Sequence, residues 1–259
     1  MTNTVTFVNQ KGGVGKTSTS YNLAYCLASA GKKTLLIDLD PSRNATKPYC
    51  NDFKYSIKNV LEDKNFDTNK AIYHAMLKEN PIENLDIIPS HVSLAVLQSH
   101  LSGRAHKEKI LKKQLEKIEG NYDYYLLDLP PMLSDFSING VYAADFIGVP
   151  LRYEKDALEG INDLFDFVKE IKETHQFNYK ILRNGFDARK KTVNLYVDNE
   201  LKPFLDKGKV FSTIIRQDEE INKAKLNDEP VITFSPKSGG AQDYISLAKE
   251  IQELFHVKN

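Results

Sequence analysis

The chain has 259 residues, which is enough for a large α/β domain with a buried core. Its 35 Lys and Arg residues balance its 35 Asp and Glu residues, so no net charge draws the whole protein onto nucleic acid, and any such binding must come from a local patch. The two cysteines, Cys26 and Cys50, are too few for a disulfide framework and lack metal-ligand spacing, which fits a reducing cytoplasm.

The first predicted elements are a strand, a glycine-rich loop and a helix. The strand covers Thr4–Asn9, the loop Gln10–Ser18 reads QKGGVGKTS, and a helix-like segment follows over Thr17–Ala30. Glycines in such a loop let backbone N–H groups turn inward around phosphate oxygens, and the helix N-terminus adds a positive dipole end. The order predicts a nucleotide-binding loop rather than a turn that binds nothing. Its predicted nucleotide-binding residues are Lys11, Gly12, Gly13, Val14, Gly15, Lys16, Thr17 and Ser18.

This loop contains two lysines. Lys16 is placed to reach the β- and γ-phosphates, and the Thr17 hydroxyl is placed to ligate Mg²⁺. Lys11 is additional and stands near the start of the loop. Because Lys16 can serve the nucleotide bound by its own chain, Lys11 is free to serve another nucleotide, such as one held by a partner chain.

Short aliphatic runs alternate with helical segments along the rest of the chain. Further strands are predicted at Thr34–Asp38, Asp86–Pro89, Tyr124–Asp128, Phe146–Pro150, Tyr179–Arg183 and Val210–Ile215. The clearest helices are Ala157–His175 and Ala241–Phe255, whereas Lys47–Asn84 is the least regular region and should hold short helices and loops. The alternation predicts a doubly wound α/β fold, with a mostly parallel sheet and helices on both faces. Since no Pro/Gly/Ser linker interrupts it, a single domain over 1–259 is expected.

Three aspartates follow apolar strands. Asp38 and Asp40 close LLIDLDP, and Asp128 closes YYLLDLPP. Because ligands bind outside the carboxyl ends of parallel strands, these carboxylates should face the loop. Asp128 is a candidate to hold Mg²⁺, Asp38 to support the metal site, and Asp40 to orient an attacking water. Aspartates that merely cap turns before proline are the alternative, which the phosphate loop in the same sheet disfavours.

Several segments together resemble a ParA/Soj-type ATPase of the MinD/ParA superfamily. The phosphate loop of this superfamily deviates from the usual P-loop sequence. Lys11 is similar to the family's signature lysine, DLDPSRNAT (Asp38–Thr46) to its first switch and DLPPMLSDFSING (Asp128–Gly140) to its second. Three further segments also follow the pattern: ALEGINDL (Ala157–Leu164), NGFDAR (Asn184–Arg189) and EPVITFSPKSGGAQDYISLAKEI (Glu229–Ile251). The match therefore runs nearly end to end.

The resemblance implies an ATP- and Mg²⁺-dependent switch that hydrolyses ATP slowly and is stimulated by a partner. ATP would be sandwiched in a homodimer in which Lys11 of each chain contacts the phosphates of the other chain's nucleotide. Lys11, Lys16 and Asp40 would be catalytic, and Asn184, Arg216 and Asp218 would add nucleotide contacts. The dimer would bind DNA without sequence preference, with a ParB-like centromere-binding protein or cargo adaptor as partner. A cytoplasmic, nucleoid-associated protein that positions a plasmid, chromosome or other cargo is expected.

The DNA-binding surface is expected at two groups of cations, with a solvated basic face as the alternative. The predicted residues are Arg189, Lys190, Lys191, Lys223, Lys225 and Lys237.

One departure from the family affects this prediction. Many members carry Pro-Arg-Asn near the adenine pocket and another basic residue shortly after it, but this chain reads RQDEE over Arg216–Glu220. Glu220 stands where that basic residue would be, so the surface is expected to be rearranged or weaker.

Two other functions share this kind of nucleotide site. A MinD-like positioning ATPase would bind membrane through a basic amphipathic C-terminal helix, but Ile245, Ala248, Ile251 and Phe255 suit a helix packed on the core, so no membrane anchoring is expected. A metabolic ligase of the dethiobiotin synthetase type is the alternative from another class. Because the first predicted strand begins a few residues from the N-terminus, no N-terminal helix-turn-helix extension is expected.

Overall fold

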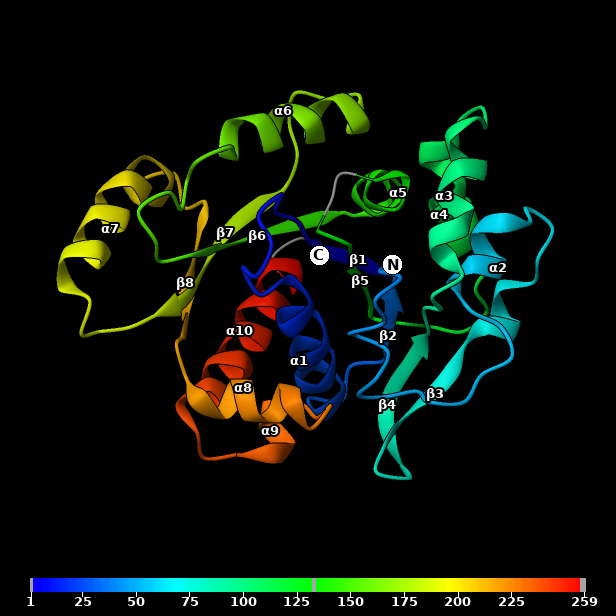
Figure 1. Ribbon diagram of the computed structural model, residues 1–259, viewed down its shortest axis with the longest axis horizontal. Helices are drawn as coiled ribbons and strands as arrows, with labels where there is room; N and C mark the ends of the chain where they lie inside the picture. The colour runs from blue at the N-terminus through cyan, green and yellow to red at the C-terminus, as the bar shows by residue number, and fades with distance from the viewer. Residues whose placement is uncertain (1, 132–133, 257–259) are drawn as a thin grey trace.

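The computed structural model describes residues 2–131 and 134–256, which form an eight-stranded sheet with helices on both faces (Figure 1). The strands are β1 (Asn3–Phe7), β2 (Thr34–Asp38), β3 (Tyr73–Leu77), β4 (Asn80–Ile88), β5 (Tyr124–Asp128), β6 (Phe146–Arg152), β7 (Tyr179–Phe186) and β8 (Val210–Arg216). Their order is β3-β4-β2-β5-β1-β6-β7-β8, and the pairs are parallel except β3 with β4. The predicted fold class is confirmed.

The described helices separate into two layers (Figure 1). One layer holds α2 (Ile57–Glu62), α3 (Leu94–Ser102), α4 (Ile110–Leu115), α5 (Asp135–Ala143), α6 (Ile161–Lys172) and α7 (Lys191–Leu205). The other holds α1 (Lys16–Ser29), α8 (Glu219–Leu226), α9 (Val231–Phe234) and α10 (Gly239–His256). Each layer has its own apolar core against the sheet, so the central strands β2 and β5 are buried over their whole length.

The sheet places its ligand-binding crevice at β1. After α1 the chain crosses to β2 on one side, and later it reaches β6 on the other side, so the strand order reverses at β1. In open α/β sheets, ligands bind in the crevice outside the carboxyl ends of the strands at such a reversal. The loop after β1 is the predicted phosphate loop, and Asp38 and Asp128 are register partners at the same edge of the sheet.

Two predicted elements differ from the structure at their ends. The helix predicted over Ala157–His175 is shorter, because Gly160 at φ 75° forms a left-handed N-cap and Glu173 at φ 51° ends α6. The strand predicted at Asp86–Pro89 is the end of the longer β4.

The hairpin of β3 and β4 was not predicted, because β3 falls in the region expected to hold short helices and loops. Burial alternates along β3, but only Ala75 is fully buried and the exposed positions include Met76, so the sequence shows no clear apolar alternation. Its turn is formed by Lys78 and Glu79 at φ 48° and 69°, where glycine or asparagine would be the usual signal.

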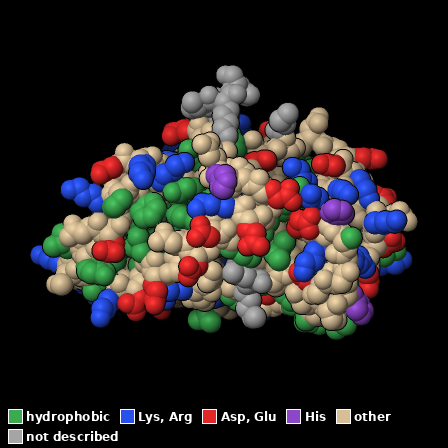
Figure 2. Space-filling view, turned by 90° about the horizontal axis from the view of Figure 1, so that it is seen from above, with side chains coloured by type: hydrophobic (Ala, Val, Ile, Leu, Met, Phe, Trp, Pro, Cys, Tyr) green, Lys and Arg blue, Asp and Glu red, His purple; other side chains and the backbone are tan. Residues whose placement is uncertain are grey.

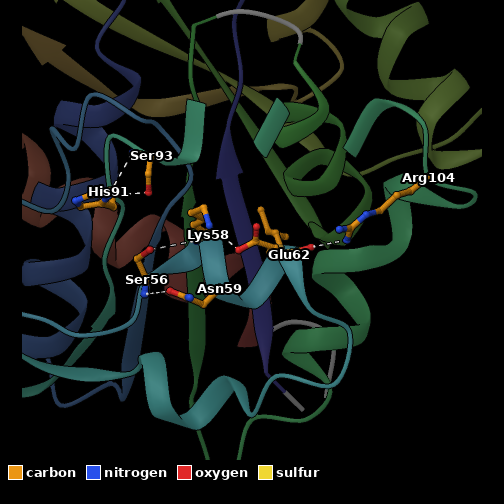
Figure 3. A network of polar contacts seen from close by, with 8 residues as sticks. Ser56, Lys58, Asn59, Glu62, His91, Ser93 and Arg104 are labelled. Atoms are coloured by element: carbon orange, nitrogen blue, oxygen red, sulfur yellow. Dashed lines mark hydrogen bonds and ion pairs between the residues drawn. The ribbon is translucent and has the colours of Figure 1, made fainter. Parts of the chain in front are cut away.

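The irregular region before the hairpin is fixed by polar contacts around α2 (Figure 3). The Ser56 N–H donates to the Asn59 amide oxygen at 3.0 Å, and the Lys58 N–H donates to the Ser56 hydroxyl at 3.3 Å, which caps this short helix. Arg104, just beyond α3, donates from Nη1 to the Leu61 carbonyl at 3.1 Å. The first two contacts cap α2, and the third joins its end to the segment after α3.

The C-terminal helix α10 packs on the core as predicted. Ala248 and Ile251 are buried, and Ile245 and Phe255 are half-buried against the same cluster. Within the described part of the chain, no helix combines the length and hydropathy needed to cross a bilayer.

Candidate nucleotide-binding site

The phosphate loop has the backbone that its glycines require. Gly13 and Gly15 have φ of 73° and 94°, and Gly15 is the N-cap of α1. Asn184, on β7, donates from Nδ2 to the Val14 carbonyl at 2.6 Å, which ties the loop to the sheet. A Cβ on Gly15 would lie 2.1 Å from that amide nitrogen, so both the backbone and the packing exclude a side chain there.

The two lysines of the loop lie in different surroundings. Lys16 is buried, and its Nζ donates to the carbonyls of Asn9 at 2.8 Å and Lys11 at 3.0 Å. Burial lowers the pKa of Lys16, and the charges of Asp128 and Asp40 oppose that shift. Lys16 is therefore held within the loop, where a phosphate of its own chain's nucleotide can replace the carbonyls.

Lys11 points the other way, toward the turn before α6. Its Nζ contacts the carbonyl of Asp156 and lies 3.5 Å from the Glu159 carboxylate, both in the same chain. The Lys11 side chain keeps 37% of its surface exposed. A surface ion pair of this kind contributes little, so the side chain can exchange it for another anion.

The three predicted carboxylates have distinct environments. Asp128 is fully buried, and its oxygens have no hydrogen-bond partner of standard geometry among the described residues, although the hydroxyls of Thr17 and Ser20 lie near enough to lower its pKa. Burial and the charge of Asp38 raise the pKa of Asp128 well above its usual range. Asp40 lines the open cleft beside the loop.

Asp38 is also fully buried, but its oxygens are occupied. They accept the Asp40 N–H at 3.0 Å, the Thr46 N–H at 2.9 Å and the Thr46 hydroxyl at 2.7 Å. Burial raises the pKa of Asp38 to about 7, against the Thr46 hydrogen bond, and the charge of Asp40 adds to the shift. Through these hydrogen bonds, Asp38 holds both ends of the Asp40–Thr46 segment. We expect Asp38 to affect a bound metal only indirectly, by positioning this segment.

The donor set around the loop fits Mg²⁺. Mg²⁺ is usually held by one or two protein oxygens, with waters and substrate phosphates completing its octahedron. Thr17 lines the cleft, and the buried Asp128 carboxyl group lies beside the Thr17 and Ser20 hydroxyls with no cation paired to it in the described residues. The same residues contain no cluster of three or more His, Cys, Asp or Glu side chains that could hold a metal without a nucleotide.

The loop opens into a cleft of about 840 Å³, within the size range of small-molecule sites. Gly12, Gly13, Gly15, Lys16, Thr17 and Ser18 line its phosphate end, and the predicted nucleotide contacts Asn184, Arg216 and Asp218 line it as well. Val14 and Lys11 are not among the lining residues, since the Val14 side chain is buried and Lys11 lies toward α6.

Arg216 and Asp218 have structural partners in this cleft. The Arg216 guanidinium donates to both oxygens of Asp243 on α10, at 2.8 and 2.7 Å. Asp218 caps α8 by accepting the Glu220 N–H at 2.9 Å, and it also accepts the Gly240 N–H at 2.7 Å. The RQDEE segment therefore joins α8 to the start of α10, in addition to lining the cleft.

Three further cations line the cleft without having been predicted to do so. Arg152 ends β6, Lys47 follows the first switch segment, and Lys225 lies on α8. Lys225 had been assigned to the DNA-binding surface. The sequence around Lys225 does not indicate that this residue lies in the cleft. It lies there because α8 packs beside the phosphate loop.

The other predicted DNA-binding residues are dispersed. Arg189 is 87% exposed and its guanidinium pairs with Asp187 at 2.8 Å, which lowers the pKa of Asp187 to about 2. Lys190 is the N-cap of α7 and Lys191 its first residue, Lys223 pairs with Glu220 at 2.8 Å, and Lys237 precedes α10. Figure 2, which shows one face of the molecule, has basic and acidic side chains interspersed. The segment Arg189–Lys191 is the one compact basic group in the predicted set.

The first predicted switch, Asp38–Thr46, is described throughout, and its ends meet at Asp38 as given above. The second predicted switch, Asp128–Gly140, is described on both sides of residues 132–133, which lie outside the described residues. Its later part begins α5, where the Ser134 hydroxyl accepts the Ser137 N–H at 3.3 Å. Both switch segments begin at the strand ends that carry Asp38 and Asp128.

Comparison with known proteins places this chain in a family. A family model described as an AAA domain matches residues 2–181. The sporulation initiation inhibitor protein Soj of Bacillus subtilis is 36% identical over 250 residues, which cover 95% of this chain and 97% of that protein. The chromosome-partitioning ATPase Soj of Treponema pallidum is 34% identical, with 97% of each chain covered. A putative plasmid partition protein of Borrelia burgdorferi, solved with AMPPNP bound, has a TM-score of 0.80 and 25% identity over 100% of both chains.

Proposed function

Because the chain belongs to the ParA/Soj-type partition ATPases of the MinD/ParA superfamily, we propose that it is an ATP-dependent dimerising switch. In this proposal residues 1–259 act as one ATPase domain that binds DNA without sequence preference and positions a cargo. The observation that carries it is the opposite placement of the two loop lysines, with Lys16 held within the loop and Lys11 directed to the exposed turn before α6. One cation can thus serve the chain's own nucleotide while the other is available to a second chain.

ATP and Mg²⁺ are the proposed cofactors, and the AMPPNP bound to the Borrelia burgdorferi protein supports the nucleotide. Mg²⁺, when bound, neutralises charge on the β- and γ-phosphates. Thr17 and Asp128 would hold it, and Asp38 would keep the Asp40–Thr46 segment in place. The N–H groups of the loop and Lys16 would bind the phosphates.

Asp40 and Lys11 have the remaining proposed roles in hydrolysis. Asp40 lines the cleft near the strand ends that carry Asp38 and Asp128, and in this proposal it would orient a water near the terminal phosphate. Lys11 would leave Asp156 and Glu159 and contact the phosphates of the partner's nucleotide. A cation supplied across the dimer makes association depend on the γ-phosphate, and it can stabilise charge in the transition state.

DNA binding is proposed for Arg189, Lys190 and Lys191, with Lys223 and Lys237 as further contacts. Lys225 is proposed for the nucleotide cleft as well, since it lines that cleft. A ParB-like or cargo-adaptor protein is the proposed stimulating partner, and the proposed location is the cytoplasm, on the nucleoid. The pairs Arg189–Asp187 and Lys223–Glu220 must open or share their cations for phosphate contact, so DNA binding should be weak at high salt.

The proposal is tested by the mass of the protein in solution with Mg²⁺ and ATP. A hydrolysis-impaired Asp40→Ala protein should be a dimer with ATP and a monomer with ADP, and Lys11→Ala in the same background should stay monomeric. A persistent monomer in the Asp40→Ala protein would overturn the switch. Turnover stimulated by a small carboxylate metabolite, without any response to DNA, would instead support a ligase, and binding to anionic lipid vesicles would support a MinD-like protein.

A further inference from the structure

The nucleotide cleft contains two arginines whose charges are bound with unequal strength. Arg216 makes two hydrogen bonds to Asp243, whose side chain is only 9% exposed, so its guanidinium is fixed against α10. Arg152 has a single ion pair, from Nε to Glu154 Oε1 at 3.3 Å, and the two side chains are 48% and 63% exposed. An exposed pair of this kind is easily exchanged, so Arg152 is the arginine that can turn to a ligand.

Arg152 lies next to the phosphate loop because two hydrogen bonds fasten the loop to its surroundings. At the start of the loop, Asn9 donates from Nδ2 to the Pro150 carbonyl at 2.8 Å, two residues before Arg152 on β6. Further along, Val14 is bound by Asn184, which is the register partner of Arg152 on β7. Arg152 thus lies close to both attachments of the loop, two residues after Pro150 on β6 and opposite Asn184 on β7.

The neighbouring backbone also directs the Arg152 side chain. A Cβ built on Gly185 would lie 3.2 Å from Arg152 Cγ, so the glycine leaves room for the arginine to pass over β7 into the cleft. Both residues line that cleft together with Gly12, Gly13 and Gly15 of the loop. The long cationic side chain of Arg152 therefore shares one cleft with the loop glycines that would cradle a phosphate.

We propose that Arg152 is a further phosphate-binding residue, which exchanges Glu154 for the β-phosphate of the nucleotide held by its own chain. The guanidinium is always charged and binds phosphate oxygens through paired N–H donors, whereas Glu154 offers one contact in solvent. Glu154 acts as a competing anion that keeps Arg152 near the cleft until nucleotide arrives. This inference rests on the proposed nucleotide-binding function and adds a contact made within one chain.

The test is calorimetric titration of the full chain with ADP, which reports the contact without requiring a dimer. Arg152→Ala should weaken ADP binding about tenfold, the scale of one hydrogen bond to a charged group. Glu154→Gln should strengthen it about twofold, because it removes the competing anion. Lys155→Ala is the matched control, since it removes an exposed cation from the same turn that does not line the cleft, and it should leave ADP affinity unchanged.

The two variants of the pair distinguish binding from a structural role. If Arg152→Ala leaves the ADP affinity unchanged, or if Glu154→Gln weakens binding as Arg152→Ala does, the phosphate contact is wrong and the pair only supports the turn. An effect seen with ATP in the dimer but not with ADP also overturns the contact within one chain. Failure of the wild-type chain to bind either nucleotide would instead overturn the proposed function itself.

Discussion

The phosphate-loop edge of the sheet and the basic segment Arg189–Lys191 carry their charges in opposite ways. At the loop edge, the Lys16 side chain is buried and donates only to backbone carbonyls, and the fully buried Asp128 has no cation paired with it among the described residues. At the basic segment, Arg189 is 87% exposed and already paired with Asp187. A buried charged group without a partner costs free energy that a ligand can recover, whereas an exposed pair contributes little. The buried charges at the loop edge therefore indicate a ligand-binding site much more strongly than the exposed charges of Arg189–Lys191 do.

The largest expected change in stability comes from a substitution at the loop edge, and a pair of glycine substitutions tests it. Gly15→Ala should lower the free energy of unfolding by about 3 kcal/mol, because a left-handed alanine is strained and its Cβ would displace the Asn184 amide from Val14. Gly12→Ala is the matched control, with no atom within 4 Å of the added Cβ, and should change stability by less than about 0.5 kcal/mol. Denaturant unfolding without nucleotide measures both, and equal losses would mean that the loop is not fixed by β7.

The next test uses the pH dependence of stability. Burial raises the pKa of Asp38 to about 7 in the folded protein, so between about pH 4 and pH 7 the folded state binds a proton that the unfolded state has lost. Stability should therefore fall as pH rises through this window, by up to about 1.4 kcal/mol per pH unit. Asp38→Asn should flatten the slope, as measured by denaturation at several pH values in a metal chelator. An unchanged slope would mean that Asp38 ionises normally in the fold.

A smaller effect is expected at Asp128. At pH 8, Asp128→Asn should raise the stability of the nucleotide-free protein by about 1 kcal/mol, because a neutral amide replaces a fully buried carboxyl group whose ionised form is costly to bury. The same variant should lose the extra thermal stability that Mg²⁺ adds to the ATP complex. Asp123→Asn, at the other end of β5, is the control and should keep the Mg²⁺ effect. A destabilised Asp128→Asn protein would mean that the Thr17 and Ser20 hydroxyls stabilise this carboxyl group more than its burial destabilises it.

The smallest effects are expected at the basic segment. In the presence of Mg²⁺ and ATP, Arg189→Ala should weaken binding to a random DNA duplex about threefold and reduce its salt dependence, as loss of one phosphate contact does. Asp187→Asn should strengthen binding about twofold, because it releases Arg189. Fluorescence anisotropy at two salt concentrations measures both. If neither substitution alters DNA affinity, the segment is a solvated surface and DNA binds elsewhere.

The residues of the phosphate loop and the alternation of strands and helices were readable from the sequence. Gly13, Gly15 and the central strands β2 and β5 are dictated by local backbone requirements and by apolar runs buried on both sides. The β3–β4 hairpin was not readable, because its edge strand is mostly exposed and its turn lacks glycine. Local pattern determines an element only where burial or backbone strain restricts the residue types.

By itself, the sequence determined that this chain has a phosphate loop with two lysines, in a parallel sheet whose aspartates follow the strands. Only the tertiary structure decided which polar groups face one another: Asp38 with Thr46, Arg216 with Asp243, and Lys11 with Asp156. The same holds for the arrival of Arg152 and Lys225 in the cleft. The physical reason is that hydrogen bonds and charge pairs act over a few ångströms between segments far apart in the chain, so their partners are fixed only when the strands and helices have packed.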